Sequence, residues 1–256
     1  MKDLKYFFKN VIILTTTVCI GEITYGQYVG QVRSEAVGGQ SGGIVNQYLI
    51  GSNWNKQKQN LIGGMEVNGS PYVSPDFRTG ILYYGDKAIE RIDFRYNAFN
   101  EELEIRDSDA KNGIGALQKD KKIAIEIGND ILSFKTFTDK SGTTINGYLL
   151  QKYDGNTYDL FERTTVKFTE PQKAQNSFTK DIPARFTKFT EYYLGYFGDG
   201  NLIVEIPNRT RKFLKMFDGD QSKEIKKFIK SNDINIKEEE QLLIILKFLN
   251  DTYDQQ

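Results

Sequence analysis

The chain has 256 residues, of which 39% are hydrophobic and 13% aromatic, enough apolar material for one sizeable core or at most two small ones. The 34 basic and 34 acidic side chains cancel, so no long-range field attracts nucleic acid, and we expect no nucleic-acid partner. Histidine is absent, which excludes Ser-His-Asp and Cys-His catalysis and histidine-ligated zinc or haem.

Residues 1–26 have the pattern of a secretory signal peptide. A positive start with Lys2, Lys5 and Lys9 precedes the apolar run Val11–Ile20, which is too short to span a bilayer, since about 20 residues are needed. Small side chains at Thr24 and Gly26 favour cleavage after Gly26. An uncleaved anchor or a core strand is the alternative. We therefore expect an exported protein, periplasmic or secreted, with outer-membrane association as a further option.

The only cysteine, Cys19, lies in the apolar run where a bacterial lipoprotein places its acylated residue. The lipoprotein pattern has a small residue immediately before the cysteine, and Val18 stands there instead. We therefore favour an unmodified Cys19 that is removed with the signal peptide. The mature chain then has no disulfide, and its fold depends on the hydrophobic core alone.

Residues 27–67 are rich in Gly, Gln, Asn and Ser, with GGQSGG at 38–43, and show no sustained apolar period. This composition predicts a loosely ordered lead-in. The single tryptophan, Trp54, is interpreted as an anchor that packs the lead-in onto the domain. The alternative is an exposed binding platform.

Residues 68–206 are predicted to form an antiparallel β domain, because short β-type runs alternate with Gly, Asn and Asp turns at intervals of about ten residues. In Arg91–Asn97 the spacing puts Ile92, Phe94 and Tyr96 on one buried face. The other expected strands are Thr79–Tyr84, Leu103–Arg106, Lys122–Ile127, Ile131–Phe137, Gly147–Tyr153 and Tyr158–Phe168. No helix-length segment separates them, which favours a curved antiparallel meander or an open barrel.

A polar connector at Pro171–Pro183 is followed by a predicted hairpin, Tyr192–Phe197 and Asn201–Ile206. Residues 207–256 then change to helical spacing and are predicted to form C-terminal helices packed on the sheet, giving a mainly β fold of the α+β type. Asp220 is a candidate N-cap, and Asn235 with Glu238 resembles a capping box before the apolar run Leu242–Leu249. We expect no transmembrane helix in the mature chain.

No catalytic, cofactor-binding or metal-binding residue is predicted. Gly113 and Gly115 lack the third glycine and the following helix of a nucleotide loop and indicate a turn or bulge. The acidic turns Asp107–Asp109 and Asp218–Asp220 lack calcium-loop spacing and are interpreted as solvated turns or helix caps.

Three acids follow the strand at Arg91–Asn97, and we interpret them as a solvated sheet edge. They are Glu101, Glu102 and Glu104. A catalytic carboxylate pair cannot be identified from spacing, because the fold alone brings such partners together.

Aromatic residues are the most suggestive feature of the predicted strands. They include Tyr83, Tyr84, Tyr96, Tyr148, Tyr153, Tyr158, Tyr192, Tyr193 and Tyr196. A curved sheet lined by them could hold a lipid or stack on sugar rings. Aromatic side chains are also ordinary strand formers, so packing in the core is the simpler interpretation.

Several segments together resemble a set of Sec-exported envelope proteins of Gram-negative Bacteroidota whose function is not established. They are the signal ending before Gln27, GSPYVSPDF at 69–77, RIDFRYNAF at 91–99, KFLKMFDGDQSKEIKKFIKSN at 212–232 and the closing helix ending in Leu249-Asn250. The resemblance implies an envelope or secreted location and supplies no activity or functional motif.

These observations favour a non-enzymatic exported protein that binds a hydrophobic or polymeric ligand, such as a lipid or glycan, or an envelope protein partner, on an aromatic-rich sheet. The first alternative is a hydrolase that acts on a glycan through paired carboxylates. The second is a structural component of a surface complex.

Overall fold

The computed structural model describes residues 45–106, 113–174, 180–196 and 202–253. The predicted signal peptide, Cys19, the first part of the lead-in and the turn Asp107–Asp109 lie outside these ranges. Strand residues outnumber helical ones by 46% to 25%, and most strands pair in one large curved sheet, so the predicted mainly β class is confirmed.

Within the described residues this sheet has twelve strands. They are β1 (Leu49–Ile50), β2 (Val67–Asn68), β3 (Arg78–Tyr84), β4 (Lys87–Asn97), β5 (Glu102–Arg106), β6 (Ile114–Leu117), β7 (Ile123–Ile127), β8 (Asp130–Thr138), β9 (Thr144–Tyr153), β10 (Tyr158–Thr169), β11 (Ala184–Tyr196) and β12 (Leu202–Glu205). Their order is β1-β6-β5-β4-β3-β7-β8-β12-β11-β10-β9, with β2 beside β11 and a further pairing of β8 with β9. All pairings are antiparallel except β12 with β8 and β11 with β2.

Five strands, β8 to β12, close into a ring of hydrogen bonds. The ring closes where Val204 of β12 pairs in parallel with Thr138 of β8. One apolar side chain from each strand fills its interior: Phe137, Leu149, Phe161, Tyr193 and Ile203. These side chains are at most 8% exposed, so the middle of the ring is a packed core.

The predicted alternation in β4 is confirmed, because Ile92, Phe94 and Tyr96 are at most 6% exposed. Asn97 departs from it, since the spacing assigns Asn97 to the exposed face and the structure buries it completely. Its side-chain oxygen accepts hydrogen bonds from the N–H groups of Phe99 and Asn100 in the following turn. A polar residue that closes a turn in this way is buried because its hydrogen bonds are made inside the protein.

The structure differs from the sequence interpretation in residues 45–67, where a loosely ordered lead-in is expected. These residues form the 3-10 helix η2 (Val45–Tyr48), β1, the helix α2 (Asn53–Ile62) and β2. Trp54 is 4% exposed and packs edge-on against Phe99 and Phe186. The anchor interpretation of Trp54 is confirmed, and this large side chain packs a segment whose composition favours disorder onto the β domain.

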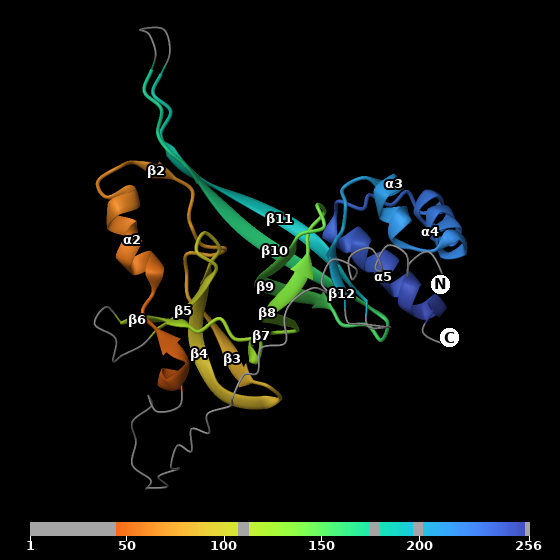
Figure 1. Cartoon of the computed structure of the whole chain (residues 1–256), viewed down its shortest axis with the longest axis horizontal. Helices are drawn as coiled ribbons and strands as arrows, with labels where there is room; N and C mark the ends of the chain where they lie inside the picture. The colour runs from red at the N-terminus through yellow and green to blue at the C-terminus, as the bar shows by residue number, and fades with distance from the viewer. Residues whose placement is uncertain (1–44, 107–112, 175–179, 197–201, 254–256) are drawn as a thin grey trace, which may run out of the picture.

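Two further strand boundaries differ from the expected ones. Residues 114–117 form the strand β6, whereas a turn or bulge is expected there; only Gly113, with φ of 66°, has turn geometry. β11 begins at Ala184, eight residues before the predicted start at Tyr192, because it follows β10 through twelve consecutive pairs. Figure 1 shows β10 and β11 as a long hairpin that extends well beyond the ring.

The C-terminal helices are α3 (Thr210–Phe213), the 3-10 helix η3 (Leu214–Met216), α4 (Gly219–Ser231) and α5 (Glu239–Tyr253). They cluster at one end of β10 and β11, opposite the end that carries α2 (Figure 1). Leu242, Ile245, Leu246 and Leu249 of α5 are fully buried and share a core with Tyr158, Leu160 and Leu194. None of the helices within the described ranges combines the length and apolar character that crossing a membrane requires.

The N-cap of α4 is Asp218 and not Asp220, because the Asp218 side chain accepts from the Gln221 N–H at 3.0 Å. The capping box expected before α5 forms in a modified way. Asn235 accepts from the Lys237 N–H and donates to Glu238, and Gln241 accepts from the Asn235 N–H. The helix therefore begins at Glu239, one residue after the predicted pair.

Candidate functional site

Of the nine tyrosines that suggested a ligand-binding sheet, four are buried in the cores and four more are half-buried against them. Tyr148, Tyr158 and Tyr193 are at most 2% exposed, and Tyr96 is 6% exposed. Tyr96 and Phe134 both contact the Tyr148 ring edge-on, at centroid distances of 5.6 and 5.2 Å. Burial raises the pKa of Tyr148 and Tyr193 well above the usual value. These rings stabilise the fold and do not form an open binding face.

The three acids after β4 also differ from the expected solvated edge. Glu101 pairs with Arg163 at 2.8 Å. Glu102 is 3% exposed and accepts from the Ser52 hydroxyl and from the N–H groups at the start of α2. Glu104 is fully buried and pairs with Arg95 at 2.7 Å. All three join distant parts of the chain, so they have structural roles.

A buried carboxyl group lies inside the ring at the end nearer the β9–β10 turn. Asp159 is 2% exposed and accepts from the Gln151 side chain at 2.7 Å and the Gly155 N–H at 2.9 Å. Burial raises its pKa to about 6, while the nearby charges of Asp154 and Lys135 act in opposite directions. Asp159 therefore titrates in the mildly acidic range.

We expect Asp159→Asn to change the pH dependence of stability. Because folded Asp159 keeps its proton to about pH 6 and an unfolded aspartate loses it near about pH 4, the free energy of unfolding falls as pH rises through this window. The substitution removes this loss, which is worth at most about 3 kcal/mol. Urea unfolding of both proteins at about pH 4 and about pH 7 measures the difference; equal pH profiles would contradict it.

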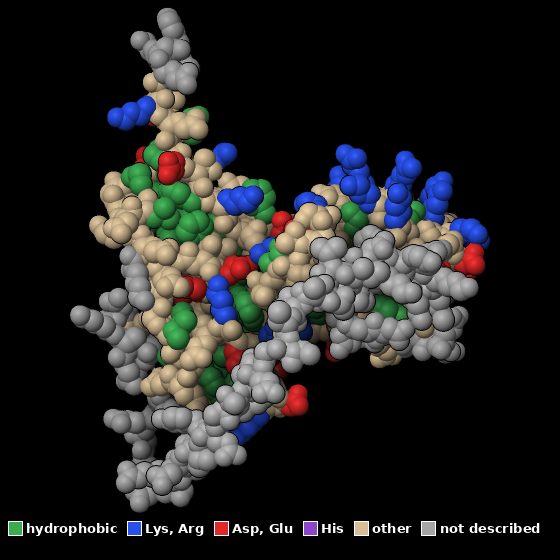
Figure 2. Space-filling model, viewed as in Figure 1, with side chains coloured by type: hydrophobic (Ala, Val, Ile, Leu, Met, Phe, Trp, Pro, Cys, Tyr) green, Lys and Arg blue, Asp and Glu red, His purple; other side chains and the backbone are tan. Residues whose placement is uncertain are grey.

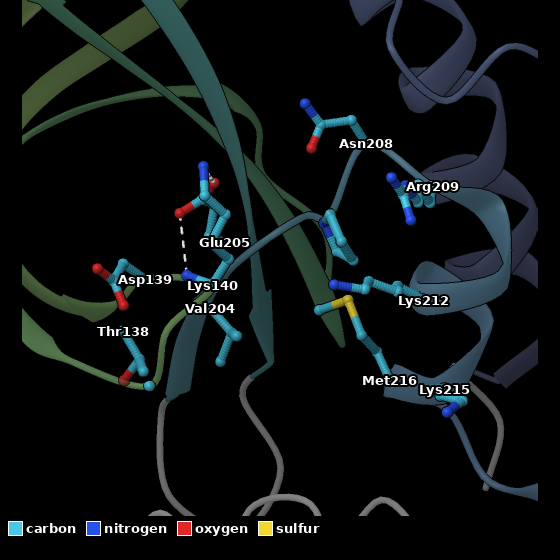
Figure 3. A pocket seen from close by; sticks show the side chains of 12 residues that line it. Thr138, Asp139, Lys140, Val204, Glu205, Asn208, Arg209, Lys212, Lys215 and Met216 are labelled. Carbon is cyan, nitrogen blue, oxygen red and sulfur yellow. Dashed lines mark hydrogen bonds and ion pairs between the residues drawn. The ribbon is translucent and has the colours of Figure 1, made fainter.

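A pocket of about 490 Å³ lies where the ring closes against the helices. One wall comes from the β8–β9 turn and the end of β12, and the other comes from α3 and η3 (Figure 3). Thr138 and Val204, the pair that closes the ring, both line it. Its volume is within the range of sites that hold a small organic ligand.

The apolar part of the pocket consists of Val204, Pro207 and Met216. Figure 3 shows Met216 and Lys212 extending from the helical side into the space before β12. Phe213, between them in sequence, is fully buried in the helical core, and Met216, 2% exposed, belongs to the same core at its edge on the pocket. Because α3 and η3 are fixed through Phe213, the side chains of Lys212 and Met216 are directed toward the pocket.

Two acids line the pocket, and both are already hydrogen-bonded. Glu205 is 7% exposed and accepts from the Lys140 N–H at 3.0 Å and from its ammonium group at 3.2 Å. Asp139 accepts from the Ser141 hydroxyl and the N–H groups of Ser141 and Thr143, and these bonds lower its pKa. Asp139 therefore closes the β8–β9 turn as a carboxylate.

Three cations of the pocket have no acidic partner in the described parts of the chain: Arg209, Lys212 and Lys215. All three are exposed and belong to one segment at the start of the helical cluster. With Lys140 already paired to Glu205, the pocket has a surplus of positive charge beside an apolar wall. This combination suits an anion that carries an apolar body.

A second pair of carboxyl groups lies beside the pocket, on the ring side of β11 and β12. Tyr193 pairs directly with Glu205, so Glu191 is the diagonal neighbour of Glu205 on the same face. The Cα atoms of such diagonal neighbours are generally about 7–8 Å apart. One Glu191 oxygen is buried with no hydrogen-bond partner among the described groups. Burial and the charge of Glu205 raise the Glu191 pKa. Glu205 lines the pocket, but Glu191 is not among the lining residues.

The structure shows no metal centre among the residues it describes, because no group of three or more Asp, Glu or Cys side chains is close enough to hold an ion. Of the two acidic turns considered, Asp218–Asp220 acts as a helix cap, and Asp107–Asp109 is outside the described ranges. The pocket cations were not predicted as a site. The only sequence signal for them is the density of Lys and Arg in residues 209–215.

No protein-family model, no curated protein and no solved structure matches the chain. The geometry of the site is therefore the basis for the function proposed below.

Proposed function

We propose that the chain is an exported, non-enzymatic binding protein of the cell envelope, periplasmic or secreted, that holds a small anionic ligand with an apolar body. The observation that carries the proposal is the group of unpaired cations, Arg209, Lys212 and Lys215, beside the apolar wall of a 490 Å³ pocket. The export part rests on the sequence of residues 1–26.

In this proposal, a phosphate or carboxylate group lies among the three cations, and the apolar body contacts Met216, Val204 and Pro207. A charge-assisted hydrogen bond contributes more than a neutral one, and the partly enclosed position reduces the competition from water. The apolar contacts add affinity in proportion to the area that they remove from water. A lipid is one ligand class with this chemistry.

We expect decyl phosphate, below its micellar concentration, to bind with one site in isothermal titration calorimetry. Lys212→Glu/Lys215→Glu weakens this binding at least about tenfold, because each charged contact contributes about 1.5–3 kcal/mol. Lys87→Glu/Lys121→Glu in the β domain makes the same change in net charge at exposed lysines outside the pocket and is the matched control. Equal binding by both double variants, or equal binding of decyltrimethylammonium, would refute the site.

A second candidate function is hydrolysis of a glycan by a carboxylate pair. It is favoured by the raised pKa of Glu191 beside Glu205, because a general acid must keep its proton. Under this candidate the protein releases nitrophenol from nitrophenyl glycosides, and Glu191→Gln abolishes the release while the protein stays folded. The hydrolase hypothesis is wrong if the unsubstituted protein releases no nitrophenol, or if Glu191→Gln still releases it.

The third hypothesis, a structural component of a surface complex, remains a prediction. Six large apolar side chains in the described ranges are exposed: Ile50, Met65, Ile131, Ile182, Phe189 and Ile244. Met65 and Ile182 each lie two residues before the paired residues Val67 and Ala184, and the other four lie on different elements. The β2–β11 end is therefore the place where this hypothesis would put a contact surface.

A further inference from the structure

Positive charge is concentrated in one short part of an otherwise neutral chain. The whole sequence has 34 basic and 34 acidic residues, but residues 209–230 have eight Lys or Arg and three Asp or Glu, an excess of five. Of the three acids, Asp218 caps α4, Asp220 pairs with Lys223 at 3.0 Å, and Glu224 accepts from the Tyr253 hydroxyl. The eight Lys and Arg side chains of this segment are all exposed, so the excess positive charge lies at the surface of the helical cluster.

On α4 this charge has a regular arrangement. Lys223, Lys226, Lys227 and Lys230 are spaced three, four and seven residues apart, so they occupy one arc of the helix, and all four are exposed. The opposite face carries Ile225 and Ile229, which are at most 6% exposed in the core shared with α5. Packing of the apolar face therefore fixes the direction of the lysine arc.

Figure 2 shows Lys and Arg side chains projecting side by side from the outer rim of the helical cluster. No carboxylate within the described ranges pairs with Lys226, Lys227 or Lys230. Like charges held this close repel one another, and an anionic surface opposite them removes the repulsion.

We propose that the lysine arc of α4 binds the anionic surface of a lipid bilayer. Attraction to such a surface requires only that several positive charges face it together. Each of them increases binding about fivefold. Recognition of nucleic acid generally adds Arg, Asn or Gln at base edges or aromatic rings that stack on bases. The arc consists of lysines alone, which favours the lipid surface.

The proposal is independent of the pocket. It involves other residues and a surface instead of a single anion, so either site can fail while the other is supported. If both are present, the lysine arc brings the protein to a membrane surface and the pocket beside it takes an anionic amphiphile.

Co-sedimentation with vesicles tests the proposal. We expect the protein with residues 1–26 removed to bind vesicles of about one-third phosphatidylglycerol in phosphatidylcholine, and not to bind pure phosphatidylcholine. At about 1 M salt, where the screening length is about 3 Å, the binding is lost. Lys226→Glu/Lys230→Glu lowers the partition coefficient at least about 25-fold, from two lysines at about fivefold each.

The control is Lys87→Glu/Lys121→Glu, the same change in net charge at exposed lysines of the β domain, which leaves binding within about twofold. If Lys226→Glu/Lys230→Glu does not fold, Lys226→Gln/Lys230→Gln replaces it in the test, with a smaller expected loss of vesicle binding. Equal loss in the arc and control variants overturns the proposal, as does binding to pure phosphatidylcholine. Tighter binding of a short DNA duplex than of the anionic vesicles, lost in the arc variant, would assign the arc to nucleic acid and also overturn it.

Discussion

Glu104→Ala is expected to lower the free energy of unfolding by about 3 kcal/mol, because it leaves a partly buried guanidinium group without its counter-charge. Glu104 is fully buried and accepts from Arg95 Nε at 2.8 Å and Nη2 at 2.7 Å. The Arg95 side chain is 16% exposed, and its guanidinium group lies 3.9 Å from the centre of the Tyr72 ring. It has little access to water as a replacement partner.

Urea unfolding followed by circular dichroism measures this loss. The control is Asp93→Ala on the same sheet, whose pair with Arg106 is long, at 4.0 Å, and exposed on both sides. Such surface pairs contribute at most about 1 kcal/mol. The double variant Arg95→Met/Glu104→Leu recovers most of the stability, since no buried charge remains. A Glu104→Ala loss no larger than that of Asp93→Ala would contradict the structural role.

Asn250→Ala is expected to destabilise the protein by about 4 kcal/mol, because it removes the clamp between α5 and the β9–β10 turn. The Asn250 side chain accepts from the N–H groups of Thr157 and Tyr158 and donates to the carbonyls of Tyr158 and Leu246. Asn250 is 5% exposed, so water does not readily replace these partners. The N–H groups of Thr157 and Tyr158 lose the Asn250 acceptor, at a cost of about 1–3 kcal/mol each.

Comparison of Asn250→Asp with Asn250→Ala separates the clamp from simple loss of volume. The aspartate keeps the acceptor for both N–H groups but faces two carbonyls without a donor. We therefore expect an intermediate loss in urea unfolding, with partial recovery at low pH, when the carboxyl group is protonated. Equal losses for the two variants at all pH values would show that the hydrogen bonds contribute little.

The same clamp explains a glycine at the turn. A Cβ at Gly155 would lie 2.4 Å from the Tyr158 carbonyl oxygen and 2.5 Å from the Asn250 side-chain nitrogen. Both distances are too short for real contacts, so the turn can approach α5 this closely only with glycine at this position.

The sequence was sufficient to predict the strands that alternate clearly. β3, β5, β7, β8 and β10 occupy the expected ranges to within one residue, and β4 and β9 begin four and three residues earlier than expected. Local period-two spacing fixes which of their side chains are buried. The apolar run of α5 was predicted for the same reason, since its length and composition require burial.

The missed features depend on contacts between distant residues. α2 is polar in composition and is held in place by Trp54 and by Glu102, which is 48 residues away from Trp54 in sequence. The ring closes through the pairing of Val204 with Thr138, which no local pattern encodes. Glu102 and Glu104 are buried because partners such as Ser52 and Tyr72 lie far away in the sequence, whereas polarity alone predicts exposure.

The pocket could not be predicted for the same reason. Its walls come from the β8–β9 turn, β12 and α3, three segments that meet only in the folded protein. The Lys and Arg residues at 209–215 are visible in the sequence, but such a run is usually a solvated helix face. Only the structure shows that Lys212 and Lys215 line a pocket with an apolar wall.

A crystal structure of the protein with decyl phosphate tests the proposed function most directly. We expect the phosphate group within hydrogen-bond distance of Arg209, Lys212 or Lys215, and the alkyl chain against Met216 and Val204. Alkyl chains bound only on the outer faces of the sheet, with the space between β12 and α3 holding water alone, would contradict the proposed ligand site.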